Sequence, residues 1–371
     1  MKRKRPREPA PVHRPLALGA IGYLVLIVVA GASLAHLGQR ELDDAALRSA
    51  TMVVEAELRE RVLDHARLRA RRADDVLANT EAAAHAIAAH LHRLGPGAVD
   101  TSRPPFEFEP AGGQALPGFA SNAHDLSGLA PDPAADEERL GALSWRGLAM
   151  IVALRTARLQ VPERTRFSVW VRGEGLLTHP RRDPTEVVAE WAVHAGFGAG
   201  VLAPPQEPDG WLAARTARDR TELLPYVVSL PDDDGQTWAI VRAELVLDDL
   251  LPRLVDSGVH DALCHSLVLD QSGRVLAAAP GTSSAFGLGT QNGEALGALT
   301  ARLAPLVGEG RAFAVGEDGT VRTGAREHLA LARVGVPGWT VAAIAPRDTV
   351  AAAAVPATET TSRAVRDFAL A

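Results

Sequence analysis

The feature that most limits how this chain can fold is an uncharged apolar run near its start, residues 15–39, from Pro15 through Gln39. A helix rises 1.5 Å per residue, so about 20 apolar residues are enough to cross the hydrocarbon core of a bilayer. The run is longer than that and contains no Lys, Arg, Asp or Glu. It therefore predicts a transmembrane helix, and the rest of the chain must fold on one side of it.

The charges that flank the run predict its orientation. Residues 1–14 hold six basic residues and one acid, whereas Glu41, Asp43 and Asp44 follow the run. Positive charge is kept on the cytoplasmic side, so we expect a cytoplasmic N-terminus and an extracytoplasmic main body. The alternative is a cleaved signal peptide with 33–35 (SLA) as its cleavage site, although signal h-regions have only about 7–15 residues.

The charge and cysteine content exclude some classes of protein. The formal net charge of −6 conceals a main body with 33 basic and 44 acidic residues after the basic arm. An acidic surface repels phosphate, so we expect no nucleic-acid partner. Cys264 is the only cysteine, so the chain cannot form an internal disulfide.

Residues 42–94 predict one long helix. They contain no Pro or Gly, and Ala, Leu, Arg and Glu, which favour helices, dominate them. Apolar and small residues recur at steps of three and four, from Leu63 to Leu94. The helix would be about 80 Å long, more than one domain surface covers, so we expect part of it to meet a second copy in a homodimer. Two shorter helices joined by a bend are the alternative.

Strand patterns and short helices follow a Pro- and Gly-rich stretch, 95–135, that predicts an irregular loop with room for one short strand. The first group of predicted elements is a helix, two hairpins and a short helix. The second group is a hairpin, a helix and an antiparallel pair of strands. This order of elements predicts an α+β fold with two small antiparallel sheets in tandem. The predicted helices are 136–159, a short one at 187–193, 248–255 and 294–306. The predicted strands are 167–171, 176–179, 225–230, 237–246, 266–269, 274–279, 311–315, 320–325, 327–334 and 339–345.

This layout and four short motifs resemble the double-Cache extracytoplasmic sensor domain of bacterial transmembrane receptors, with its two PAS-like modules. The resemblance covers roughly residues 42–347. The family's Arg-x-Trp-Tyr segment, which marks its amino-acid binders, is not present between Asp183 and Trp211. The four motifs are 167–180 (FSVWVRGEGLLTHP), 243–250 (AELVLDDL), 267–279 (LVLDQSGRVLAAA) and 338–346 (GWTVAAIAP).

The resemblance implies the sensing part of a signal-transduction receptor of the sensor-kinase, chemoreceptor or phosphatase type. The chain would cross the bacterial inner membrane once, with its main body in the periplasm and its output module absent from this sequence. A membrane-anchored envelope scaffold or interaction protein without a small-molecule ligand is the alternative. The expected division is a basic arm (1–14), transmembrane helix (15–39), long signalling helix (41–94), irregular loop (95–135), membrane-distal module (136–255), membrane-proximal module (256–349) and tail (350–371).

We expect the ligand site in the distal module, at Trp170, Trp211, Tyr226 and Glu244. Aromatic side chains commonly line small-molecule sites, and a few polar groups orient the ligand. The resemblance implies that Glu244 occupies the position of an acid that receives a ligand amine, through a charge-assisted hydrogen bond. The expected ligand is an amine, an amino acid or a carboxylate. Alternatively, Trp170 and Tyr226 are core residues and Glu244 pairs with a nearby Arg.

The sequence carries no recognisable catalytic or metal-binding motif. It has no Walker A motif, no H-E-x-x-H and no Cys-x-x-Cys. His260, Cys264 and His265 are close in sequence, but a zinc site there would need a second Cys or further ligands. We therefore expect neither an enzyme activity nor a cofactor nor a metal in this part of the receptor.

Overall fold

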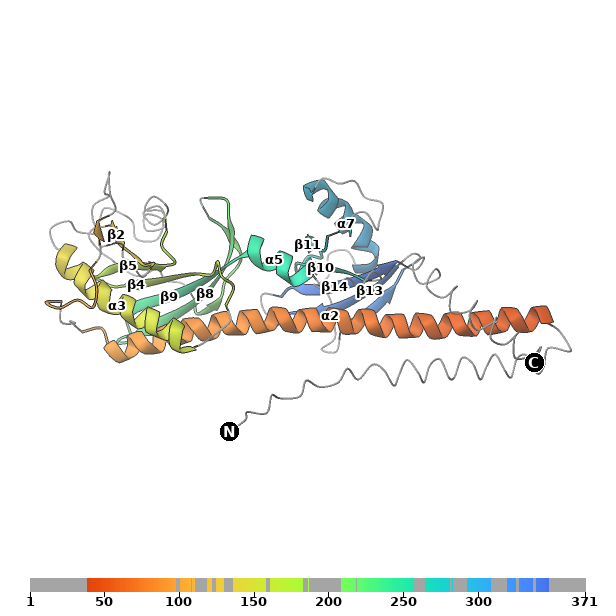
Figure 1. Ribbon diagram of the computed structural model, residues 1–371, viewed down its shortest axis with the longest axis horizontal. Coiled ribbons are helices and arrows are strands. Elements are labelled where there is room, and N and C mark those ends of the chain that lie inside the picture. The colour runs from red at the N-terminus through yellow and green to blue at the C-terminus, as the bar shows by residue number, and fades with distance from the viewer. Residues whose placement is uncertain are drawn as a thin grey trace, which may run out of the picture.

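The computed structural model consists of two antiparallel sheets placed side by side along one long helix (Figure 1). We call the sheet farther from the start of the helix the distal sheet and the nearer one the proximal sheet. The residues that the structure describes are 39–97, 101–107, 109–110, 119–121, 125–129, 136–157, 161–182, 186, 208–217, 219–256, 264–280, 282, 292–307, 319–324, 327–335 and 338–346.

The long helix, α2 (Gln39–Leu94), is continuous over 56 residues, which confirms the predicted rod rather than two bent helices. It ends at Gly95, whose φ of 72° lies in the left-handed region that glycine adopts without strain. The backbone N–H of Gly95 donates to the carbonyl oxygens of Leu91 and His92, which satisfies two groups at the helix end.

No helix within these described ranges combines the length and the apolar character that crossing a bilayer requires. The predicted transmembrane helix at 15–39 lies outside them except for Gln39, which begins α2. The predicted basic arm and tail also lie outside them.

The distal sheet has nine strands in the order β1-β2-β3-β5-β4-β9-β8-β6, with β7 also paired to β8. All of its pairs are antiparallel. The strands are β1 (Glu109–Pro110), β2 (Phe119–Ser121), β3 (Ser127–Leu129), β4 (Arg166–Val171), β5 (Gly175–His179), β6 (Gly210–Trp211), β7 (Arg215–Thr216), β8 (Glu222–Pro231) and β9 (Thr237–Val246).

The predicted irregular loop at 95–135 is where the structure departs from the sequence analysis. Its described residues include β1, β2 and β3, which extend the distal sheet beyond β5. These strands have only two or three residues each, too few to show an alternating pattern in the sequence. Strand β3 pairs with β5, which lies about 50 residues later in the chain, whereas β2 pairs with β3 and β1 with β2.

The proximal sheet has five strands in the order β11-β10-β14-β13-β12 and is separate from the distal sheet, as predicted. Helix α5 (Leu247–Val255) leads from β9 to the proximal sheet. The strands are β10 (His265–Leu269), β11 (Val275–Ala278), β12 (Thr320–Thr323), β13 (Glu327–Arg333) and β14 (Thr340–Pro346), and helix α7 (Asn292–Val307) lies between β11 and β12 in the chain.

Helix α2 contributes to the cores of both modules. One buried cluster joins the middle of α2 to α5 and the proximal sheet, and includes Val62, Ala66 and Ala73. A second cluster joins its last turns to helix α3 (Asp136–Ala157) and the distal sheet, and includes Ala84 and Ile87. The predicted stripe is therefore largely confirmed, although Leu94 at its end is exposed. Because small alanines alternate with larger residues, the helix backbone lies close to both sheets.

Candidate ligand-binding face

The two faces of the distal sheet differ in chemistry. Side chains alternate between the faces of a strand, so odd and even positions of β4 have different surroundings. Phe167, Val169 and Val171 join the apolar cluster under α2 and α3. Ser168 and Trp170 therefore lie on the opposite face, away from the two helices.

A row of four polar residues crosses the middle of this opposite face. Ser127 on β3 is directly opposite Thr178 on β5, and Thr178 is opposite Ser168 on β4. Ser168 is in turn opposite Arg242 on β9. All four are buried, with relative exposures of 0–2 %. We call Ser127, Thr178, Ser168 and Arg242 the polar row.

Several polar atoms on this face have no hydrogen-bond partner among the described residues. They include Ser168 Oγ, Thr178 Oγ1 and Glu244 Oε2. Burying a hydroxyl without a partner costs about 1–3 kcal/mol, and such groups are rare in folded proteins. Three of them on one sheet face indicate a surface that meets polar groups from outside these strands, such as a bound ligand or ordered water.

Glu244 lies on the same face as the polar row, two positions after Arg242 on β9. Its Oε1 forms an ion pair with the guanidinium of Arg215 and lies 4.0 Å from Nη1 of Arg242. The predicted pairing of Glu244 with a nearby Arg is therefore present. One oxygen of a buried carboxylate is held by the protein, and the other is the Oε2 without a described partner.

The edge of this face carries a second ion pair. Arg166, directly opposite Glu244, bonds Asp219 with 3.0 Å between Nη2 and Oδ2. Burial alone would raise the pKa of Asp219, but hydrogen bonds from Thr221 and from the Arg166 guanidinium outweigh it and lower the pKa to about 2. Asp219 is therefore ionised at neutral pH, and it forms a charged pair with Arg166 at the edge of this face.

The four predicted site residues fall on two different faces. Trp170 is buried on the face of the polar row, and Glu244 is on that face as well. Trp211 on β6 is opposite Tyr226 on β8, and their rings are 5.0 Å apart. Tyr226 belongs to the cluster under the helices, so Trp211 and Tyr226 lie on the other face from Glu244.

Tyr226 connects the distal sheet to α2. Its hydroxyl lies 2.9 Å from Nε2 of His85, and the two rings meet edge to face. Burial, followed by the nearby carboxylate of Glu81, raises the pKa of Tyr226 to about 12. Tyr226 is therefore placed to hold the helix against the sheet, and this is a packing role rather than one of contact with a ligand on the polar face.

The polar row was not predicted from the sequence. A signal for it exists, because Ser168, Thr178 and Arg242 are polar residues flanked on both sides by apolar residues or alanine, or on one side where the strand ends, within largely apolar strands. An isolated polar residue in a strand of this kind is costly to bury, so it points to a specific role. Only the strand order brings the three together, since they come from three different strands.

The proximal sheet has a different second face. Its leucines on β10 and β13 pack against α7 in an apolar cluster that contains Leu267, Leu269, Leu299 and Leu303. Within the described part of the chain, no three His, Cys, Asp or Glu residues are grouped as a metal site would need. His260, one residue of the candidate zinc group, lies outside the described ranges.

The comparisons with known proteins gave matches only among solved structures. No family model matches it, and no curated protein matches it. The ligand-binding domain of the Campylobacter jejuni chemoreceptor Tlp3, in complex with L-valine, is 9 % identical, with 81 % of this chain and 97 % of that one covered and a TM-score of 0.42. The corresponding domain of Pseudomonas fluorescens CtaA, in complex with L-serine, is 10 % identical, with 49 % and 73 % covered and a TM-score of 0.30.

A third similar structure is the ligand-binding domain of the Pseudomonas aeruginosa amino-acid chemoreceptor PctB with L-Arg, which is 11 % identical over 50 % of this chain and 72 % of that one, with a TM-score of 0.27. These neighbours are ligand-binding domains of chemoreceptors. At such identities and scores the likeness does not by itself assign a ligand to this chain.

Proposed function

We propose that this chain is the extracytoplasmic sensing part of a membrane-anchored signal-transduction receptor, and that it binds a small molecule on the polar face of the distal sheet. The observation that carries the proposal is the polar row, with Ser168 Oγ and Thr178 Oγ1 buried and unpartnered among the described residues. A face that only packed against protein would gain stability from apolar residues at these positions. The corresponding proximal face, covered by α7, is built in that way.

The charges on the face favour a ligand with polar ends. Arg242 offers a guanidinium for a carboxylate, and Glu244 Oε2 offers an acceptor for an ammonium group. An α-amino acid carries both an ammonium and a carboxylate group. An amine carries only the first, and a carboxylate ligand only the second. These three classes are the ligands that we propose to test first.

Helix α2 is the element through which binding would reach the membrane. It contacts the distal sheet through His85 and the proximal module through His65, whose Nε2 lies 2.9 Å from Ser266 Oγ. Asp74 accepts a hydrogen bond from the backbone N–H of Gly335 at 2.8 Å. A ligand that favoured one packing of α2 would thereby shift a two-state equilibrium of the whole rod. We further propose a single membrane crossing at 15–39 and a homodimer through α2.

A scaffold without a ligand is the second candidate, and the ion pair between Arg215 and Glu244 favours it. This pair satisfies part of the buried carboxylate within the chain itself. A scaffold predicts that the polar face binds nothing and that its hydroxyls can be removed without consequence.

Isothermal titration of the full chain in detergent against amino acids, amines and carboxylates tests the proposal. We expect heat from one of these classes, and expect the double variant Ser168→Ala, Thr178→Val to lose it. Thr156→Val is the matched control, because its hydroxyl lies on the exposed side of α3 and donates to Val152 O. A folded sample that gives no heat with any class would support the scaffold and overturn the sensing proposal.

A further inference from the structure

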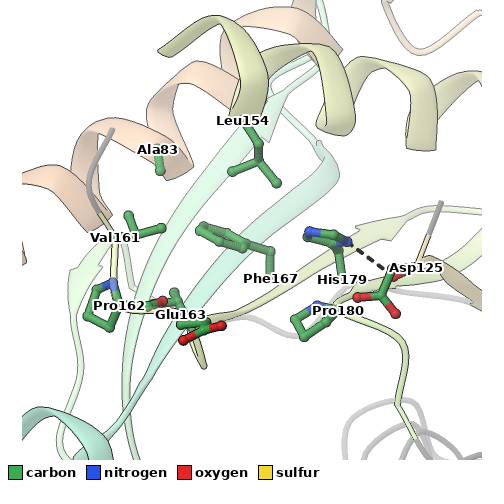
Figure 2. A pocket seen from close by; sticks show the side chains of 10 residues that line it. Ala83, Asp125, Leu154, Val161, Pro162, Glu163, Phe167, His179 and Pro180 are labelled. Atoms are coloured by element: carbon green, nitrogen blue, oxygen red, sulfur yellow. Dashed lines mark hydrogen bonds between the residues drawn. The ribbon is translucent and has the colours of Figure 1, made fainter. Parts of the chain in front are cut away.

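The distal module also contains a pocket on the helix side of the sheet, away from the polar row. It has a volume of about 250 Å³ and lies where α2, α3 and the ends of β4 and β5 meet. Its buried lining includes the apolar Ala83 of α2 and Phe167 of β4, together with Thr165, whose hydroxyl donates to Pro162 O. Figure 2 shows Phe167 beneath Leu154 of α3, with Val161 to one side.

The mouth of the pocket carries hydrogen-bond acceptors. Asp125 and Glu163 are exposed, and they are the charged residues that line the pocket. Asp125 Oδ1 accepts from the backbone N–H of Arg181 at 3.1 Å. No Arg or Lys side chain is among the described residues that line the pocket. The mouth is therefore complementary to a cation.

His179 adds a neutral acceptor between the mouth and the inner wall. Its Nδ1 lies 3.1 Å from the carbonyl oxygen of Asp125. Because a carbonyl can only accept, Nδ1 carries the proton and Nε2 of the neutral ring is left as an acceptor. Figure 2 shows this second ring nitrogen on the side that faces Phe167.

We propose that this pocket is a second binding site, for a small amine that carries a compact apolar group. The apolar part would lie against Phe167 and Leu154, and the ammonium group would lie between Glu163, Asp125 and His179 Nε2. A volume of 250 Å³ equals that of about eight water molecules, which suits a molecule with about as many non-hydrogen atoms. Such a ligand would touch α2 directly at Ala83, on the opposite face of the sheet from the site proposed above.

Phenethylamine is a suitable probe, with phenylethanol as the neutral analogue of the same shape. In the full chain in detergent, we expect phenethylamine to bind and phenylethanol to bind at least about tenfold more weakly, since the charge-assisted hydrogen bonds are lost. The double variant Asp125→Asn, Glu163→Gln should weaken phenethylamine binding by a similar factor. Both residues are exposed and Asn tolerates the positive φ of Asp125, 60°, so the variant should fold.

Two controls separate this site from the polar face. Glu222→Gln changes an exposed acid at the start of β8 and should leave the affinity for phenethylamine unchanged. Glu244→Gln changes the acid of the polar face, so it weakens an amine bound on that face and not one bound in the pocket. Equal binding of the amine and the alcohol would overturn the proposal, and so would loss of amine binding in Glu244→Gln but not in the pocket variant. The two variants therefore distinguish the sites, because amine binding on the polar face is weakened by Glu244→Gln and amine binding in the pocket by Asp125→Asn, Glu163→Gln.

Discussion

Ser168 and Thr178 face each other across β4 and β5, both are buried, and neither hydroxyl has a hydrogen-bond partner among the described residues. Two such hydroxyls side by side in the middle of a sheet reduce the stability of the module. A protein retains groups of this kind where they serve a purpose other than folding.

Thr178→Val should stabilise the ligand-free protein. The substitution removes an unpartnered buried hydroxyl at nearly constant volume, so we expect a gain of about 1 kcal/mol in the free energy of unfolding. Urea unfolding of the full chain in detergent, followed by tryptophan fluorescence, measures it. Thr165→Val is the matched control: Thr165 is also buried, but its Oγ1 donates to Pro162 O at 2.7 Å, so this variant should lose about 1 kcal/mol. Equal losses of unfolding free energy in both variants would mean that the Thr178 hydroxyl has a hydrogen-bond partner.

Arg146→Met should destabilise the distal module. Arg146 on α3 is fully buried, bonds both carboxylate oxygens of Glu174 at 2.8 and 3.1 Å, and donates to the carbonyl oxygen of Gly95 at 2.7 Å. Its guanidinium also lies 5.1 Å from the ring centroid of Trp238. Losing one partner of a buried pair costs about 3–5 kcal/mol, and we expect a loss in that range in urea unfolding.

The control for Arg146 is Arg61→Met on α2. Arg61 pairs with Glu57 at 2.6 Å, but its side chain is 60 % exposed. Exposed pairs contribute less than about 1 kcal/mol, so this variant should unfold almost like the parent. A similar small loss for Arg146→Met would show that the ends of α2, α3 and the turn between β4 and β5 are held together by other contacts.

Tyr226 should ionise late in the folded protein. Its pKa is raised to about 12, so the neutral hydroxyl is favoured by folding, and this contribution to stability is complete below the ordinary tyrosine pKa of about 10. It is lost as the pH rises from about 10 through 12. The chain has two tyrosines, so Tyr23→Phe leaves Tyr226 alone to be followed by the absorbance of tyrosinate. A midpoint near 10 in the folded protein would contradict the buried contact with His85.

Leu68→Asp should weaken the proposed homodimer. Leu68 lies on α2 and is 50 % exposed, which is unusual for a leucine on a helix packed against two modules. If a second copy covers it, a charge there should raise the dimer dissociation constant by about tenfold or more. Sedimentation equilibrium of the full chain in detergent measures the change. Val152→Asp, on the 39 % exposed Val152 of α3, is the control and should leave the constant unchanged. If Val152→Asp raised the dissociation constant and Leu68→Asp did not, the dimer interface would involve α3 instead of this face of α2.

Most of the local structure follows from local sequence patterns. The absence of Pro and Gly over 42–94 predicts α2, and turn residues between alternating strands predict the β4–β5, β8–β9 and β13–β14 hairpins. These signals succeed because backbone propensity and the period of apolar residues act over a few neighbouring positions. At most one short strand was predicted where β1–β3 lie, because each of these strands has only two or three residues and β3 pairs with the distant β5.

The sequence by itself therefore determined the long helix, the two tandem α+β modules and the presence of Trp170 and Glu244 in the distal one. Only the tertiary structure decided which residues share a face. It separated Trp211 and Tyr226 from Glu244, and it aligned Ser127, Thr178, Ser168 and Arg242 in one row. The physical reason is strand register: a side chain's face depends on which residue of another strand lies opposite it, and that pairing is set by contacts between segments far apart in the chain.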